Sequence, residues 1–399
     1  MKKTKIMGAA MLVVILLIGF IMRAPITTPP LFLGKLATAL NVNQSSLGIL
    51  TTLPLVMFML LSNFAAKPMA YFGLKKALLM ALAIIVTGSL LRLVMTMPTM
   101  ILGTVLIGIG IAHLNVFMPS MVTAYFPHKI GLYTTMYSFA MIFGNTVFNL
   151  ITAPVSRVFG WKMMMGILLL TPVIALLGWG MIYRFVDEKI RVDRSKQWQT
   201  TKTQSAKLWR NRRAWPFLLT FGGQATLSYT FTAWMPSLMQ YHHVSAGNSG
   251  LIMACFALIG LPLSIVLPNL LTTATNRVLI VLTIGAGMSG LTASCMLFWQ
   301  NTSSMLFWML ESLLLGIAIG FFFMTAMTMF AVKTNSPYET ARLSGMAQSG
   351  GYLMSAFGPS LYGMAFAANP VGNIQNVVYV VLVMLMLISC VLVIKTEKI

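Results

Sequence analysis

The sequence predicts an all-α membrane protein in which twelve transmembrane helices form two pseudo-symmetric sets of six, with both termini in the cytoplasm. Three observations support this fold class. The mean hydropathy is +0.85, only 8% of the 399 residues are charged, and the charges fall in short stretches between long apolar runs. Because soluble domains carry charges at roughly a quarter of their positions, we expect most of this chain to be surrounded by lipid.

Each long apolar run is a candidate membrane crossing, because a helix needs about 20 apolar residues to span a bilayer core of about 30 Å. The first six predicted segments are 7–33, 46–66, 77–97, 99–124, 131–153 and 163–183. The second six are 215–239, 247–270, 278–299, 303–331, 343–367 and 374–394. The ten-residue alternation of barrel strands is absent, so helices are expected throughout.

The basic residues fall on alternate loops of this diagram. Twenty-two Lys and Arg residues lie on the side of the two termini. The opposite side has only Lys35, Arg92, Arg157 and Lys162. Lys and Arg accumulate in cytoplasmic loops, which predicts cytoplasmic termini and a multi-pass membrane protein; the family resemblance given below implies the bacterial inner membrane.

The longest polar stretch divides the chain into two comparable parts. We expect an N-terminal six-helix half at 1–186, a basic cytoplasmic linker at 187–213 and a C-terminal half at 214–399. The halves resemble one another: GIGIA at 108–112 matches GIAIG at 316–320, and Arg23 and Tyr229 each lie seven residues before a proline. Parallel repeats with a site near the membrane midplane between them are a transporter layout.

Several missing patterns argue against other classes of protein. The sequence has no Gly-x-x-x-x-Gly-Lys phosphate loop, and its three cysteines and four histidines show no metal-ligand spacing. A single carboxylate within the apolar segments leaves paired-acid catalysis without a second group. We therefore expect no enzyme activity, no catalytic residues, no cofactor and no metal. The net charge of +21 follows membrane sidedness, so nucleic acid is not an expected partner.

Arg23 is the strongest single candidate for substrate contact. It lies within the first apolar segment, where a charge costs roughly 2.5–3.5 kcal/mol and normally faces a water-filled cavity or a partner. Its planar guanidinium suits an oxyanion or another flat, electron-rich group. The alternative is a structural pair with Glu311 or with backbone carbonyls. Arg92 lies near the end of its segment, so we expect it to extend outward to the membrane surface.

Glu311 is the only carboxylate in a predicted membrane segment. Counted along straight helices, Glu311 is about 12 Å and Arg23 about 15 Å from the outer ends of their segments, which permits contact between them. Glu311 could carry a coupling proton, form a fixed ion pair or lie at the outer mouth.

Other polar and aromatic residues on the segments are candidates to line the cavity. Of His113 and Asn115, which point to different sides of one helix, we favour Asn115 because Pro119 follows on its face. Tyr137 and Asn145 share a face, as do Gln348 and Tyr352. Tyr229 and Trp234 offer a phenol and an indole to a small planar ligand.

Several motifs resemble the major facilitator superfamily and, within it, the bacterial cyanate and 2-nitroimidazole transporters. They are Arg23-Ala24-Pro25, LGILTTLPLVMF at 47–58, GIGIAHLNVFMPSMVTAYFP at 108–127, TTMYS at 134–138 and TAWMPSL at 232–238. The resemblance implies a secondary transporter of small anions or small polar molecules, with Arg23 in the site. One departure is Ala70, which stands where this superfamily has an Asp in the loop after helix two.

The sequence leaves three functions to compare. The first is a symporter or antiporter that moves a small anion or weak acid by alternating access, as a monomer in the lipid bilayer, with Arg23 supplying the charge. The second is proton-coupled efflux of a drug or polar heterocycle, with Glu311 as the proton site. The third is a membrane receptor or scaffold, which the sequence disfavours because it has no appended domain or long tail.

Overall fold

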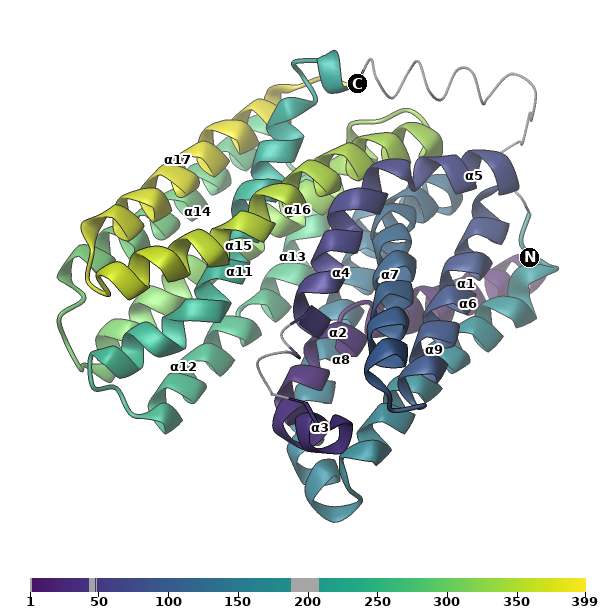
Figure 1. The fold of residues 1–399 in the computed structure, drawn as a ribbon. Helices are drawn as coiled ribbons and strands as arrows, with labels where there is room; N and C mark the ends of the chain where they lie inside the picture. The colour runs from purple at the N-terminus through teal and green to yellow at the C-terminus, as the bar shows by residue number, and fades with distance from the viewer. Residues whose placement is uncertain (1, 43–46, 48, 188–207) are drawn as a thin grey trace. The chain divides into compact units, whose positions relative to one another are not determined.

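The computed structural model describes residues 2–42, 47, 49–187 and 208–399, and all regular structure within these residues is helical (Figure 1). The chain forms two compact units. The first contains Met1–Lys207 with Ser336–Gly345, and the second contains Leu208–Asn335 with Met346–Ile399. Most of the predicted linker, 188–207, lies outside the described residues.

The first unit contains helices that follow the predicted segments, with breaks in two of them. They are α1 (Lys2–Ile21), α2 (Ala24–Thr27), η1 (Pro29–Phe32), α3 (Leu33–Leu40), α4 (Ile49–Leu61), η3 (Ser62–Phe64), α5 (Ala66–Phe72), α6 (Leu74–Arg92), α7 (Met97–Tyr125), α8 (Ile130–Val158) and α9 (Trp161–Tyr183). The predicted segment 7–33 is not one regular helix, because α1 ends at Ile21 and α2 begins at Ala24, although Ala9–Thr27 is long and apolar enough to form one membrane span.

The second unit contains α11 (Trp215–Tyr241), α12 (Ala246–Leu258), α13 (Gly260–Thr273), α14 (Asn276–Met296), η4 (Leu297–Trp299), α15 (Met305–Val332) and α17 (Asn373–Lys395). It also contains α16 (Pro337–Ala368) from Met346 onward, since the first turns of α16 cluster with the first unit. In those turns, Gly345 lies against the backbone carbonyl of Ser62 and the hydroxyl of Thr340 donates to that of Thr123 at 3.2 Å.

Nine helices of the described chain are long and apolar enough to cross a membrane, or ten if one pair bent by 51° counts as one span. The predicted number of twelve is therefore not reached by this criterion. Helices α11 and α16 have 27 and 32 residues, which is sufficient length at 1.5 Å per residue. They are excluded because glycine, serine, threonine and glutamine make them more polar, and they carry Tyr229, Trp234, Gln348 and Tyr352.

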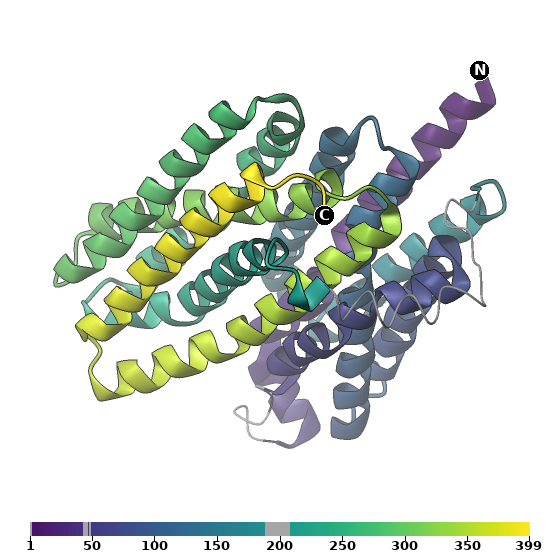
Figure 2. The ribbon, with the colours of Figure 1, turned by 90° about the horizontal axis from the view of Figure 1, so that it is seen from above.

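The two units repeat the same helix pairs (Figures 1 and 2). In the first unit α1 contacts α9, α4 contacts α7, and α6 contacts both α7 and α9. In the second unit α11 contacts α17, α13 contacts α15, and α14 contacts both α15 and α17. The GIGIA and GIAIG motifs lie at matching contacts, because a Cβ on Gly108 would meet Met57 at 3.0 Å and one on Gly316 would meet Ile259 at 2.7 Å.

Candidate substrate-binding residues

The first helix of the chain is interrupted next to Arg23. Pro25 has no N–H to give to the carbonyl of Ile21, and its ring disfavours helical geometry in the turn before it. Helix α1 accordingly ends at Ile21, and the short helix α2 begins at Ala24 with Arg23 as its N-cap. The depth of about 15 Å expected for Arg23 along a straight helix therefore does not apply.

Arg23 is exposed, whereas its neighbours Ile21, Met22, Ala24 and Pro25 are buried. Its carbonyl accepts the backbone N–H groups of Ile26 and Thr27 at 3.0 and 3.1 Å. The main chain at this residue is thus fixed by the turn that follows it, while the side chain extends from the protein surface of its unit. Because a guanidinium is costly against hydrocarbon, this exposure favours an aqueous or substrate-filled surrounding.

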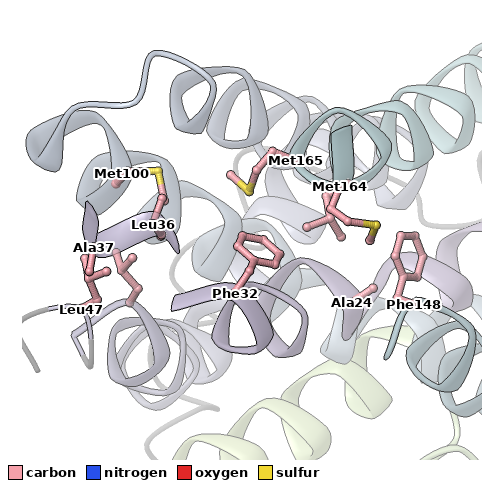
Figure 3. Close-up of a cluster of buried hydrophobic side chains, with 11 residues drawn as sticks. Ala24, Phe32, Leu36, Ala37, Leu47, Met100, Phe148, Met164 and Met165 are labelled. Carbon is pink, nitrogen blue, oxygen red and sulfur yellow. The ribbon is translucent and has the colours of Figure 1, made fainter. Parts of the chain in front are cut away.

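An apolar cluster holds the segment that follows Arg23 (Figure 3). Ala24 from α2 and Phe32 from η1 are 0% and 4% exposed, and they belong to the same buried cluster as Met100 of α7 and Phe148 of α8. Met164, Met165 and Leu168 bring α9 to this cluster. The interrupted segment is therefore packed on both sides of its prolines, which limits how far Arg23 can move with its backbone.

Thr27 and Asn145 form a polar contact one turn after Arg23. The Thr27 hydroxyl lies 2.5 Å from Asn145 Oδ1 and 3.2 Å from the Arg23 carbonyl oxygen. Asn145, a predicted site residue, is half-buried on α8 and faces the interrupted helix. Thr27 was missed by the sequence analysis, although its position four residues after Arg23 in an apolar run was an available signal.

Arg92 differs from expectation, because it does not extend to the membrane surface. It is only 3% exposed at the last residue of α6. Its Nη1 donates to the Pro25 carbonyl oxygen at 2.6 Å, and its Nε and Nη2 donate to Thr104 Oγ1 at 3.1 and 2.7 Å. These buried acceptors outweigh outward extension, since hydrogen bonds to a charged group contribute roughly 1.5–3 kcal/mol each.

The remaining candidates of the first unit are buried to different degrees. Asn115 on α7 is 8% exposed and Tyr137 on α8 is fully buried. The Tyr137 hydroxyl has no hydrogen-bond partner among the described residues. The backbone carbonyl oxygen of Tyr137 would lie 2.6 Å from a Cβ on Gly19 of α1. His113 is half-buried, with Nδ1 2.8 Å from the carbonyl oxygen of Ile109. Tyr137 and Asn145 thus both lie on the side of α8 that faces the first helix.

Glu311 lies on α15 in the second unit and is fully buried. Its Oε2 accepts the Ser312 hydroxyl at 3.3 Å, and its Oε1 has no hydrogen-bond partner among the described residues. A buried carboxylate without a paired cation is strongly disfavoured in its charged form. Since Arg23 and Glu311 belong to different units, their pairing stays a prediction.

Several aromatic side chains lie near Glu311. Tyr362 and Tyr379 are in charge contact with it, and their ring centroids are 5.9 Å apart. Trp308, one turn before Glu311, is fully buried and stacks on His242 at 5.8 Å. Sequence reasoning did not select Tyr362, Tyr379 or His242, because nothing in their spacing relates them to Glu311.

Trp234 is held by the neighbouring helix, and its indole N–H is therefore engaged within the protein. Nε1 donates to the Pro359 carbonyl oxygen of α16 at 2.7 Å. Its ring lies 6.1 Å from Tyr362 and 5.4 Å from Phe366. Trp234 is half-buried, so it offers a ring face rather than a donor. Tyr229, five residues earlier on α11, is also half-buried.

Gln348 and Tyr352 occupy the part of α16 that packs on α11. Gln348 is fully buried and Tyr352 is 8% exposed, with its ring edge against Phe221 at 5.3 Å. A Cβ built on Gly351, between them in sequence, would meet the Cα of Gly222 at 2.9 Å. This close approach of α11 and α16 brings the two most polar long helices of the second unit together.

The described residues contain no group of three or more His, Cys, Asp or Glu side chains that could hold a metal ion. The first unit instead presents an exposed guanidinium on a fixed, interrupted helix. The second unit presents a buried carboxylate among aromatic rings. Such groups can bind an anion and a proton, respectively, by charge and hydrogen bonding.

Comparison with known proteins gives the family. The chain is 29% identical over 364 residues to the 2-nitroimidazole transporter of Escherichia coli, covering 89% of this chain and 88% of the relative. It is 24% identical over 360 residues to the cyanate transport protein CynX of the same organism, covering 89% of each. The resemblance predicted from the motifs is therefore confirmed, and these relatives are transporters rather than enzymes.

Solved structures agree with the fold. The proton:xylose symporter XylE superposes with a TM-score of 0.72 over 96% of this chain and 94% of that chain, at 13% sequence identity. The match to the family description Major Facilitator Superfamily extends over residues 11–359. The chain is thus a multi-pass membrane protein that belongs to the Major Facilitator Superfamily.

Proposed function

We propose that this protein is a secondary active transporter that moves a small anion or a small, flat, polar molecule across the bacterial cytoplasmic membrane, with Arg23 contacting the substrate. The observation that supports this proposal is the exposed Arg23 guanidinium at the start of the packed α2 segment. An exposed guanidinium can donate hydrogen bonds to a substrate with electron-rich oxygen or nitrogen atoms.

The names of the relatives are consistent with this substrate class. Cyanate is a small anion and 2-nitroimidazole is a flat heterocycle with a polar nitro group. A planar guanidinium can donate two parallel hydrogen bonds to either kind of group. We propose that Asn115, Tyr137 and Asn145 of the first unit, and Tyr229, Trp234, Gln348 and Tyr352 of the second, contribute the remaining contacts.

The proposal includes a membrane arrangement. Helices α11 and α16 would cross as polar helices, and together with the nine apolar spans and the bent pair counted as one span they give the expected twelve crossings with cytoplasmic termini. The 22-to-4 distribution of basic residues between the two sides supports this orientation. Transport by alternating access then requires only that bound substrate favours one of two conformations over the other. We expect the transporting unit to be a monomer.

Uptake by purified protein in liposomes tests this function, with labelled cyanate and 2-nitroimidazole as probes. We expect uptake of at least one probe, and about hundredfold lower uptake by Arg23→Ala, because removing one partner of a hydrogen-bonded charge pair that is enclosed on binding costs roughly 2–5 kcal/mol. Arg23→Lys should be intermediate, since it keeps the charge and loses the planar fork. Arg157→Ala, which removes an exposed basic residue of α8, is the matched control. Unchanged uptake by Arg23→Ala would refute the proposal.

A second candidate function, proton-coupled efflux of a drug or polar heterocycle, is favoured by Glu311. The Glu311 carboxylate is fully buried, and its Oε1 has no hydrogen-bond partner among the described residues. These surroundings suit a group that alternates between protonated and charged forms. Flux of 2-nitroimidazole should then follow an imposed pH gradient in the parent protein and ignore it in Glu311→Gln. Glu397→Gln, which alters a carboxylate near the C-terminus, should behave as the parent. A pH response retained by Glu311→Gln would rule this role out.

A further inference from the structure

Two prolines leave a backbone carbonyl of the interrupted first helix without its normal partner. In a helix, the Pro25 carbonyl oxygen would accept the N–H of the residue four positions later, which is Pro29 and has no N–H. The neighbouring carbonyls do find donors: the Arg23 oxygen accepts Thr27 N–H at 3.1 Å, and the Ala24 oxygen accepts Thr28 N–H at 3.1 Å. Pro25 is buried, so its carbonyl needs a donor from elsewhere in the protein.

Arg92 supplies that donor from another helix, 67 residues away in sequence. Its Nη1 lies 2.6 Å from the Pro25 oxygen. Arginine suits this position because it stays charged and has several donors in a fixed fork. Its location at the C-terminal end of α6 also places the cation where the helix dipole is negative.

The position of Arg92 is itself fixed by α7. Thr104 Oγ1 accepts from both Nε and Nη2 of Arg92, and the Thr104 hydroxyl donates to the Met100 carbonyl oxygen at 2.6 Å. The stem of Arg92 crosses α7 at Gly103, where an added Cβ would lie 2.9 Å from Arg92 Cγ. The guanidinium therefore connects α6, α7 and the interrupted helix through hydrogen bonds of fixed geometry.

We infer that Arg92 is a positioning residue: by capping the Pro25 carbonyl it holds the proline-interrupted segment, and thereby sets where the Arg23 side chain is presented. The effect of Arg92 on transport rests on the proposed function of Arg23. Its effect on the position of the Arg23 side chain does not depend on that function. The two arginines of the first unit therefore have different roles. Arg23 meets the substrate, and Arg92 holds the backbone two residues further along the chain.

The rate of thiol labelling at position 23 measures this presentation without any substrate. Cys255, Cys295 and Cys390 are replaced by alanine, Arg23→Cys is introduced, and the reaction with a charged methanethiosulfonate reagent is followed in the purified full-length protein. We expect Arg92→Met to change this rate by about tenfold or more, which corresponds to about 1.4 kcal/mol. Adding Pro29→Ala should restore the parental rate to within about twofold, because alanine, unlike proline, has a backbone N–H to give to the Pro25 carbonyl.

The matched control is Arg157→Met, which removes an exposed basic residue of the same unit and should leave the rate unchanged. If Arg92→Met alone does not fold, the inference predicts that Arg92→Met with Pro29→Ala folds and labels as the parent does. A labelling rate unaffected by Arg92→Met, a rate that Pro29→Ala does not restore, or a double variant that also fails to fold would each overturn the inference.

Transport assays separate this inference from the proposed function. In the protein that retains Arg23, Arg92→Met should lower uptake of the transported probe, cyanate or 2-nitroimidazole, about tenfold, with recovery on adding Pro29→Ala. If Arg23→Ala has no effect on uptake, the proposed function fails while the labelling result still decides the role of Arg92. If Arg23→Ala abolishes uptake and Arg92→Met changes neither uptake nor labelling, only the positioning role fails.

Discussion

The two units of this transporter use the same helix contacts but differ in their first helices. In the first unit α1 ends at Ile21 and the chain continues through α2 and η1, whereas α11 in the second unit runs unbroken from Trp215 to Tyr241. The number of prolines explains this difference between the first helices. The first unit has three prolines within six residues, Pro25, Pro29 and Pro30, whereas α11 has only Pro236 in its interior. A shared architecture thus accommodates a broken helix and a continuous one at corresponding places.

The units also differ in the charges that they place in membrane helices. The first unit has an exposed Arg23 and a buried Arg92, and the second has the buried carboxylate of Glu311. Opposite charges in the two units suit a transporter in which one unit binds an anionic or electron-rich substrate and the other binds a proton. Helix packing is thus repeated between the units, whereas the charged groups in the proposed function are not.

The largest expected difference is in probe affinity between variants of Arg23 and of Tyr229. These two residues lie at corresponding positions, each seven residues before a proline. Arg23→Ala should weaken binding of the transported probe about hundredfold. Tyr229→Phe should weaken it by about tenfold at most, because a neutral hydrogen bond contributes only roughly 0.5–1.5 kcal/mol. Binding measured by ligand-induced thermal shift checks both values. Equal losses of probe affinity in the two variants would show that Arg23 does not contribute more to substrate binding than Tyr229.

The next largest effect tests the close contacts of each unit's first helix. Gly144→Ala places a Cβ against the Phe20 backbone, and Gly351→Ala places one against Gly222. We expect each change to lower the free energy of unfolding by about 1–3 kcal/mol. Gly166→Ala and Gly285→Ala are controls with no atom within 4 Å of the new Cβ, and should be neutral or slightly stabilising. Denaturation of the purified protein in detergent measures these free energies of unfolding. Equal values for all four variants would contradict the shared packing.

A smaller effect is expected at Trp234. Trp234→Phe keeps a ring near Tyr362 and Phe366 but removes the hydrogen bond to the Pro359 carbonyl. We expect a loss of about 1 kcal/mol in unfolding free energy, with probe affinity changed less than by Tyr229→Phe. A large loss of affinity with unchanged stability would show that the substrate contacts the indole N–H and not only the ring face.

The smallest effect concerns His242, which lies beyond the end of α11. Burial, and secondarily the charge of His243, lower the pKa of His242. Because the unfolded chain binds this proton more readily, the stability contribution is complete above the ordinary histidine pKa of about 6.5 and decreases as the pH falls below it. His242→Gln should flatten the dependence of melting temperature on pH between about 7 and 5. His128→Gln, which alters an exposed histidine of the first unit, should leave it unchanged.

Sequence reasoning predicted the elements of the fold better than the contacts of the site. Apolar runs located α6, α7, α9 and α17 within a few residues, because burial in lipid imposes length and composition. The same criterion missed the break at Arg23, although Pro25 gave a local signal for it. It could not show that Arg92 reaches Pro25 or that Thr27 reaches Asn145 across 118 residues, since hydropathy does not specify which helices are neighbours. Ala70 on α5 is buried, in accord with the absence of an acid there, because an unpaired buried carboxylate is costly.

The most direct test of the central claim is an experimental structure of the protein with its transported probe, cyanate or 2-nitroimidazole, bound at saturating concentration. The account predicts probe oxygen or nitrogen atoms about 2.7–3.0 Å from the Arg23 guanidinium, with Arg92 still on the Pro25 carbonyl. A well-ordered probe that binds elsewhere, with Arg23 making no contact to it, would contradict the account.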